Sequence, residues 1–143
     1  MANPQSTAKV SQRPASAAVT TTGSSPAMVT LAGWLVPGLG HILQGRWIRG
    51  ILLMLAVFTM FFAGLGMQGK VYSFNTGDLL DILGFVGDLG AGVVYFAARS
   101  MDWGAGNIHR AVADYGTKYI VVAGLLNVIA AVDAYHIAIG KKQ

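Results

Sequence analysis

The sequence predicts an all-α integral membrane protein with four transmembrane helices, arranged as two helical hairpins behind a disordered N-terminal tail. Three observations predict this class. The 143-residue chain is 54% hydrophobic and only 11% charged, whereas a soluble domain carries about a quarter charged residues. One small soluble core cannot bury so many apolar positions. The apolar residues also fall into long stretches, which polar and glycine-rich segments separate.

Charge and cysteine content limit the classes of function. The formal net charge is +4 and comes from scattered basic residues, which suits anionic lipid headgroups better than nucleic acid. We therefore expect a lipid bilayer as partner and no nucleic acid. Cysteine is absent, so disulfides, thiolate metal sites and cysteine nucleophiles are excluded.

The chain divides into a tail, residues 1–26, and a membrane domain, residues 27–142. The tail is rich in Ser, Thr, Ala and Pro and has no apolar core of signal-peptide length. Such a composition predicts disorder. The predicted spans cover residues 27–44, 51–68, 79–98 and 119–139.

The first span is charge-free but near the lower length limit for a hydrocarbon core of about 30 Å. Pro37 should kink this helix or end its regular part. The connector to the second span is so short that the two helices must be antiparallel neighbours. This hairpin corner contains Pro37, Gly38, Gly40, His41, Gly45, Arg46, Arg49 and Gly50.

The corner has the composition of a membrane interface. Its glycines allow close approach of the two helices. Arg46, Trp47 and Arg49 are typical of the headgroup level, where charged side chains snorkel and indole rings settle. Four spans would place both chain ends on one side, with Arg46–Arg49 and Arg99–Lys118 together on the other. Because basic residues are enriched on the cytoplasmic side of membrane proteins, their distribution favours a cytoplasmic location for that second side.

Acidic residues make the third span unusual. Seven residues at about 100° each bring Asp88 within about 20° of Asp81, so both lie on one helical face. An aspartate at mid-span costs about 2.5–3.5 kcal/mol on insertion scales. Asp88 is thus either a proton or cation site or a polar group that joins two helices, with Asn127 as one candidate partner. We favour the structural role because such polar contacts are common in membrane bundles.

Asp133 and His136 are three residues apart in the fourth span and can pair locally. Together with Asp81, both are expected near the side of the chain ends. With Asp88 they would form a polar trail to mid-membrane, as in a half-channel. We favour an Asp–His pair that caps the bundle, because no acidic trail reaches Asp88 from the other side.

The histidines give no metal or cofactor motif. No two of His41, His109 and His136 are spaced three or four residues apart, and no cysteine helps. In the four-span arrangement His41 and His136 lie on opposite sides of the membrane. We expect no metal, no cofactor and no catalytic residue.

Two stretches resemble known families. The pattern Gly-His-x3-Gly-Arg-x3-Gly at residues 40–50, followed by an apolar run, resembles the hairpin of the two-transmembrane (TM-two) domain family, although the run after the histidine is shorter and lacks aromatic residues. Residues 114–117, 122–127 and 132–140 resemble an uncharacterised family of small bacterial membrane proteins. This resemblance implies a multi-pass protein of the bacterial inner membrane and brings no known activity.

These observations leave two classes of function. The first is a non-enzymatic accessory, scaffold or assembly subunit of a membrane complex, with a protein partner or self-association in the membrane. The alternative is a small proton or cation transporter, or a channel-like protein, that uses Asp88, Asp133 and His136. No acid, base and nucleophile converge in a motif, so an intramembrane enzyme has no support.

Overall fold

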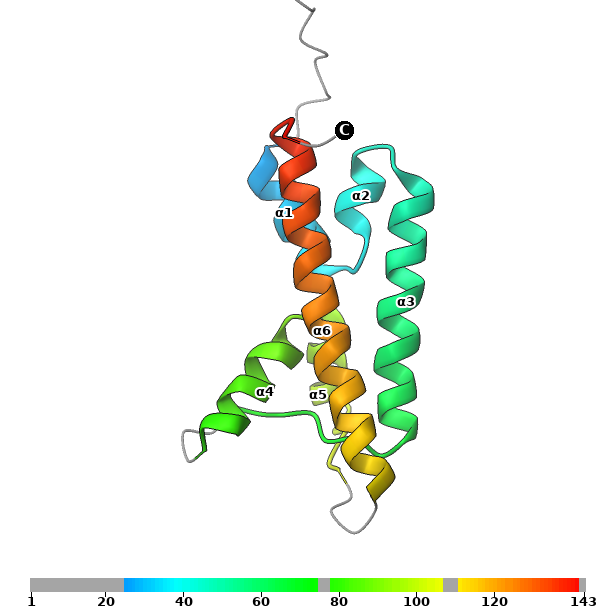
Figure 1. Ribbon diagram of the computed structural model, residues 1–143, viewed down its shortest axis with the longest axis vertical. Helices are drawn as coiled ribbons and strands as arrows, with labels where there is room; N and C mark the ends of the chain where they lie inside the picture. Colours follow the sequence, from blue (N-terminus) through cyan, green and yellow to red (C-terminus); the bar gives the residue numbers. More distant parts are fainter. Residues whose placement is uncertain (1–24, 75–77, 107–110, 142–143) are drawn as a thin grey trace, which may run out of the picture.

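The computed structural model describes residues 25–74, 78–106 and 111–141 (Figure 1). The predicted all-α class is confirmed. The described residues form six helices: α1 (Pro26–Leu35), α2 (Leu39–Leu43), α3 (Trp47–Gly66), α4 (Leu79–Leu89), α5 (Val93–Ser100) and α6 (Ala111–Ala138). By length and composition α3 and α6 can cross a membrane, and the bent pair α4–α5 makes a third candidate if it counts as one span. Most of the predicted tail lies outside the described residues.

Helices α3 and α6 form the antiparallel axis of the molecule. At the lower end of Figure 1, Gly64 of α3 lies against Gly116 and Ile120 of α6, where an added Cβ would come within 2.6 Å of the Gly116 carbonyl oxygen. At the upper end, Arg49 of α3 reaches Asp133 of α6. The buried core lies between these helices and the α4–α5 pair.

The predicted span over residues 27–44 is wrong as a single helix. Ser25 caps α1 by accepting a hydrogen bond from the Met28 amide at 3.3 Å. The helix ends at Leu35, because Pro37 has no N–H to continue it and Val36 before it is extended. Gly38, with φ of 79°, turns the chain back.

Helix α2 then returns along α1 towards the upper end. An added Cβ on Gly40 would lie 2.9 Å from the Val29 carbonyl oxygen and 3.3 Å from the Gly33 Cα. Two short antiparallel helices therefore replace the expected crossing. The corner between α2 and α3 is close-packed at Gly50, where a Cβ would lie 2.5 Å from Ile42 Cγ1, but open at Gly45.

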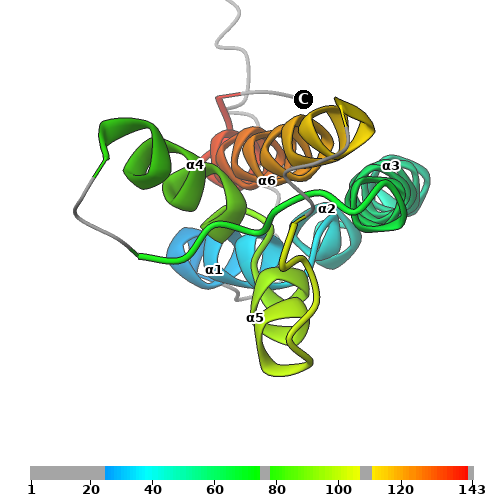
Figure 2. The same cartoon turned by 90° about the horizontal axis from the view of Figure 1, so that it is seen from below.

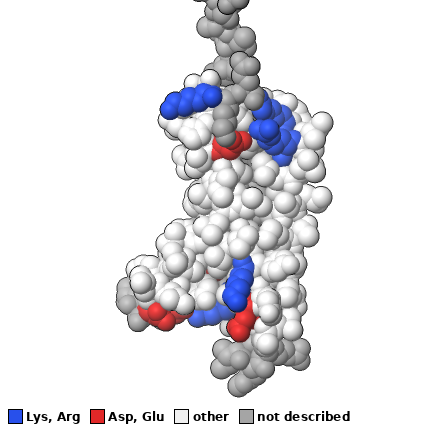
Figure 3. Space-filling view, viewed as in Figure 1, with Lys and Arg blue, Asp and Glu red and all other residues white. Residues whose placement is uncertain are grey.

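This reversal corrects the predicted sidedness. Because the chain turns back before it reaches the lower end, Arg46 and Arg49 lie at the upper end, beside the C-terminal part of α6. Lys118 lies near the opposite end of α6. The described basic residues are divided between the two ends (Figure 3). The charge asymmetry that favoured a cytoplasmic connector side is therefore lost.

A second pair of short helices enters from the lower end. Asp78 caps α4 by accepting from the Leu80 amide at 3.1 Å. Residues 90–92 interrupt the helix and α5 leaves at 113° to α4, so the predicted span over residues 79–98 is not one straight helix. The chain returns to the end where α4 began, since the Val71 amide donates to the Gly104 carbonyl at 2.8 Å (Figures 1 and 2).

The two halves of the chain have the same order of helices and run in opposite directions through the molecule. In α1–α2–α3 and again in α4–α5–α6, two short helices joined at a break precede a long helix. The second short helix of each pair begins after a glycine with positive φ, Gly38 at 79° and Gly92 at 62°. The α1–α2 pair opens towards the upper end and the α4–α5 pair towards the lower end (Figure 1). This is the arrangement of an inverted repeat.

The contact between α4 and α6 depends on Gly124. A Cβ there would collide with the Gly87 carbonyl oxygen and lie 3.0 Å from the Ala91 amide nitrogen. We expect Gly124→Ala to destabilise the fold by about 1–3 kcal/mol, because backbone atoms cannot move aside as a side chain can. Gly66→Ala is the matched control, since its Cβ would meet no atom within 4 Å. Circular dichroism during denaturant unfolding in detergent measures both, and equal stabilities would contradict the predicted close contact.

Candidate functional site

The two helix breaks meet at a buried amide halfway along α6. Asn127 is completely buried, and its Nδ2 donates to the Trp34 carbonyl at 2.8 Å and the Gly90 carbonyl at 2.8 Å. These carbonyls belong to the ends of α1 and α4, where the last backbone acceptors of a helix have no partner within it. An amide group has two N–H donors. Asn127 donates one N–H to the end of α1 and the other to the end of α4.

Backbone also meets backbone at this junction, which we define as Trp34, Gly90 and Asn127. An added Cβ on Gly92 would lie 2.6 Å from the Leu35 carbonyl oxygen and closer still to that of Trp34. Ala91, between the two glycines, has no exposed surface. The α1 end therefore rests directly on the break between α4 and α5, where Gly90 and Asn127 are buried.

Asp88 of α4 is fully buried, as Asn127 of α6 is. Its Oδ2 accepts from the Tyr72 amide at 2.7 Å, and the Tyr95 hydroxyl donates to the Tyr72 carbonyl at 3.2 Å. Both hydrogen-bonding groups of the Tyr72 backbone are thus held by side chains of the α4–α5 pair. No hydrogen bond joins Asp88 to Asn127, so that predicted pairing is wrong.

Asp88 and Asn127 each also have one side-chain oxygen that accepts no hydrogen bond from the described residues. In the part of the chain that the structure describes, Asp88 Oδ1 and Asn127 Oδ1 are buried without a hydrogen-bond partner. Sequence reasoning identified both residues from the energetic cost of a polar group in lipid. It missed Trp34, Gly90 and Tyr72, because they contribute backbone atoms that leave no signature in the side-chain pattern.

Asp133 belongs to a separate cluster at the upper end. Its Oδ2 lies 3.2 Å from His41 Nε2 and 3.5 Å from Arg49 Nη1. His41 is only 1% exposed, and Gln44 beside it donates to the Ala134 carbonyl at 2.9 Å. His41 was predicted in the corner but not as a partner of α6, because the four-span arrangement put it on the far side of the membrane.

The predicted polar trail to Asp88 is not formed. Asp81 lies at the lower end, where its Oδ1 is 3.5 Å from Lys70 Nζ, whereas Asp133 and His136 lie at the upper end. The separation follows from the break between α4 and α5, where the chain bends by 113° and returns to the lower end, so that only α6 runs between Asp81 and Asp133. Among the described residues no three His, Cys, Asp or Glu side chains are placed to hold a metal ion, and His109 lies outside them. The absence of metal and cofactor stays a prediction.

Residues 28–143 match the model of a family of unknown function, DUF6677. The chain belongs to this family. No curated protein and no solved structure shows a match to it. The predicted membership of an uncharacterised family is confirmed at this level. The resemblance to the TM-two hairpin and the bacterial membrane location stay predictions.

The junction generates a prediction about Asn127. We expect Asn127→Leu to destabilise the protein by roughly 2–4 kcal/mol, because it leaves two buried carbonyls without donors and each costs about 1–3 kcal/mol. Asn127→Asp should be at least as harmful, since a carboxylate would face both carbonyl oxygens. Thr59→Leu, at an exposed position of α3, is the control for loss of a polar group. Denaturant unfolding in detergent measures all three, and a fully stable Asp variant would refute the role of the amide.

Proposed function

We propose that this protein is a multi-pass protein of the bacterial inner membrane that works without catalysis, as a scaffold, accessory or assembly subunit of a membrane complex. The observation that carries the proposal is the bonding of two of its buried polar side chains. Asp88 and Asn127 have no exposed surface. Asn127 donates to backbone carbonyls at the ends of α1 and α4, and Asp88 accepts from the Tyr72 amide of the connector before α4. Buried side chains bonded in this way stabilise the fold. A stable fold is what a scaffold needs to present a constant surface to its partner.

The membrane arrangement we propose has two crossings and two re-entrant pairs. At 1.5 Å per residue, the 20 residues of α3 are about 30 Å long, which matches the hydrocarbon core. Helix pairs α1–α2 and α4–α5 would enter from opposite sides and return. Irregular backbone is tolerated at membrane depth only where protein covers it. The complete burial of Ala91 and the bonds of Asn127 meet that condition.

Single-cysteine labelling tests this topology cleanly, because the chain has no cysteine of its own. We expect Ser73→Cys and Ser100→Cys to be labelled from one side of the membrane and Lys141→Cys from the other. Thr59→Cys, at mid-height in α3, should resist labelling from both sides. Four full crossings would instead put Ser73 and Ser100 on opposite sides, and that result would overturn the re-entrant arrangement.

A transport function is the second candidate, and one observation favours it. Broken helices that meet near mid-membrane in an inverted repeat are typical of secondary transporters. Asp88, next to the break, has one carboxyl oxygen without a partner among the described residues. Asp133 and His136 lie at the upper end, away from it, so a proton or cation route would depend on Asp88 without them.

Flux measurements separate the two candidates. Asp88→Asn keeps an acceptor for the Tyr72 amide and cannot titrate, so we expect it to fold as the wild type does. If the protein is a scaffold, liposomes containing either form should show no proton or cation flux above empty liposomes. Flux in the wild type that the Asn variant lacks would overturn the proposal in favour of transport.

A scaffold must bind another protein or further copies of itself, so the proposed function also predicts a stable assembly. Native mass spectrometry of the protein extracted from its own membranes in mild detergent should show a stoichiometric assembly with a second protein or with further copies. A monomer under several mild extraction conditions would contradict the proposed function.

A further inference from the structure

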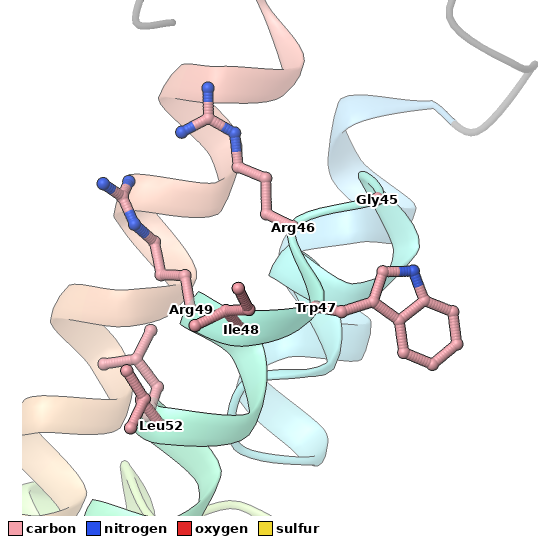
Figure 4. A pocket seen from close by; sticks show the side chains of 7 residues that line it. Gly45, Arg46, Trp47, Ile48, Arg49 and Leu52 are labelled. Carbon is pink, nitrogen blue, oxygen red and sulfur yellow. The ribbon is translucent and has the colours of Figure 1, made fainter.

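A groove of about 750 Å³ runs along the outer surface at the start of α3. Arg46 and Arg49 line its mouth, and Trp47, Ile48, Leu52 and Leu53 line the rest (Figure 4). The two arginine side chains extend to one side of the start of α3, and Trp47 extends to the other (Figure 4). The groove lies at the upper end of the molecule, where α3 begins.

The two arginines act on the same side of the groove. Arg46 is the N-cap residue of α3 and Arg49 lies in its first turn. Figure 4 shows both side chains extending in the same direction. The Arg49 side chain is 52% exposed, so its guanidinium has donors free for a second partner beyond Asp133. Arg46 forms no ion pair within the described residues.

Positive charge is in excess at this mouth. Asp133 is the single acidic residue at the described upper end, and it is already shared between His41 and Arg49. Among the described residues no side chain caps the start of α3, so its first backbone amides add partial positive charge. At the lower end, by contrast, the described basic residues stand among aspartates, including the Lys70–Asp81 pair.

The apolar wall of the groove is formed by Ile48, next to Arg49, and by Leu52 and Leu53 further along α3. Leu52 follows Arg49 by three residues, which is roughly 4.5 Å along the helix. Ile48 is 79% and Leu52 61% exposed, so this wall has no cover from the rest of the described chain. A small anion would use the mouth alone, whereas a ligand with a charged head and an alkyl chain would use the whole groove.

We propose that this groove binds an anionic phospholipid, with the headgroup phosphate between Arg46 and Arg49 and one acyl chain along Leu52 and Leu53. Planar guanidinium groups pair with phosphate oxygens through two parallel hydrogen bonds. Trp47 lies at the headgroup level, as indole rings do at membrane interfaces. The assignment goes beyond the proposed function and holds for a scaffold or a transporter alike, since it concerns only the lipid at the surface.

The experiment compares lipids of equal chain length on the full-length protein. Delipidated protein in detergent is titrated with phosphatidylglycerol or phosphatidylcholine, and bound lipid is counted by native mass spectrometry. We expect retention of phosphatidylglycerol but not of phosphatidylcholine. The double variant Arg46→Gln, Arg49→Gln should bind phosphatidylglycerol about tenfold more weakly, because the charge-assisted bonds to phosphate are lost.

Matched controls separate this site from bulk charge. Lys70→Gln with Lys118→Gln removes the same charge at the lower end and should leave binding unchanged. Arg46→Gln alone breaks no described ion pair, so it serves if the double variant fails to fold. Leu52→Gln should weaken lipid binding without any change in charge.

Three results would overturn the proposal. The first is equal phosphatidylglycerol binding by the wild type and the arginine variants. The second is an equal loss in the lysine control, which would indicate attraction by net charge only. The third is full competition by inorganic phosphate at the lipid's own concentration, which would indicate an anion site without a lipid chain.

Discussion

The amide of Asn127 is the contact on which the rest of the structure depends. Helices α1 and α4 end halfway through the molecule, and their terminal carbonyls need donors that solvent cannot supply at a fully buried position. The two acceptors, at Trp34 and Gly90, are 93 and 37 residues from Asn127 in the chain. One NH2 group satisfies both, so α6 must lie where the two helix pairs meet. The antiparallel packing of α3 against α6 then closes the core around that point.

Hydropathy predicted the class of fold and the two long helices but not the paths of the other two apolar stretches. Residues 27–44 are charge-free whether they cross the membrane or turn back within it, so their composition cannot distinguish the two. Pro37 marked the place of the break. The direction that the chain takes after it depends on Gly38 adopting positive φ and on α2 packing against α1 and α6, which are tertiary contacts. The errors in sidedness follow from this turn, which moves Arg46 and Arg49, and from the break between α4 and α5, which keeps Asp81 and Arg99 at one end.

The polar residues were easier to predict than their partners. Asp88 and Asn127 were identified because lipid makes a buried polar group costly, and that cost depends only on position in an apolar stretch. Their partners are backbone atoms of Tyr72, Trp34 and Gly90, which any residue type could supply. His41 and Asp133 are 92 residues apart and at no helical spacing. Local periodicity can therefore indicate which residues are buried, but not which distant segment meets them.

The chain order of the junction has a consequence for biosynthesis. Both helix pairs leave the ribosome before α6, which carries the only side chain that bonds to both of their ends in the described structure. An unsatisfied carbonyl in hydrocarbon costs several kcal/mol. Until α6 arrives, we expect the α1–α2 and α4–α5 pairs to remain at the membrane surface, where water can serve as donor. Nascent chains that stop short of Asn127 would then be substrates for membrane quality control, and maturation of the protein would depend on α6.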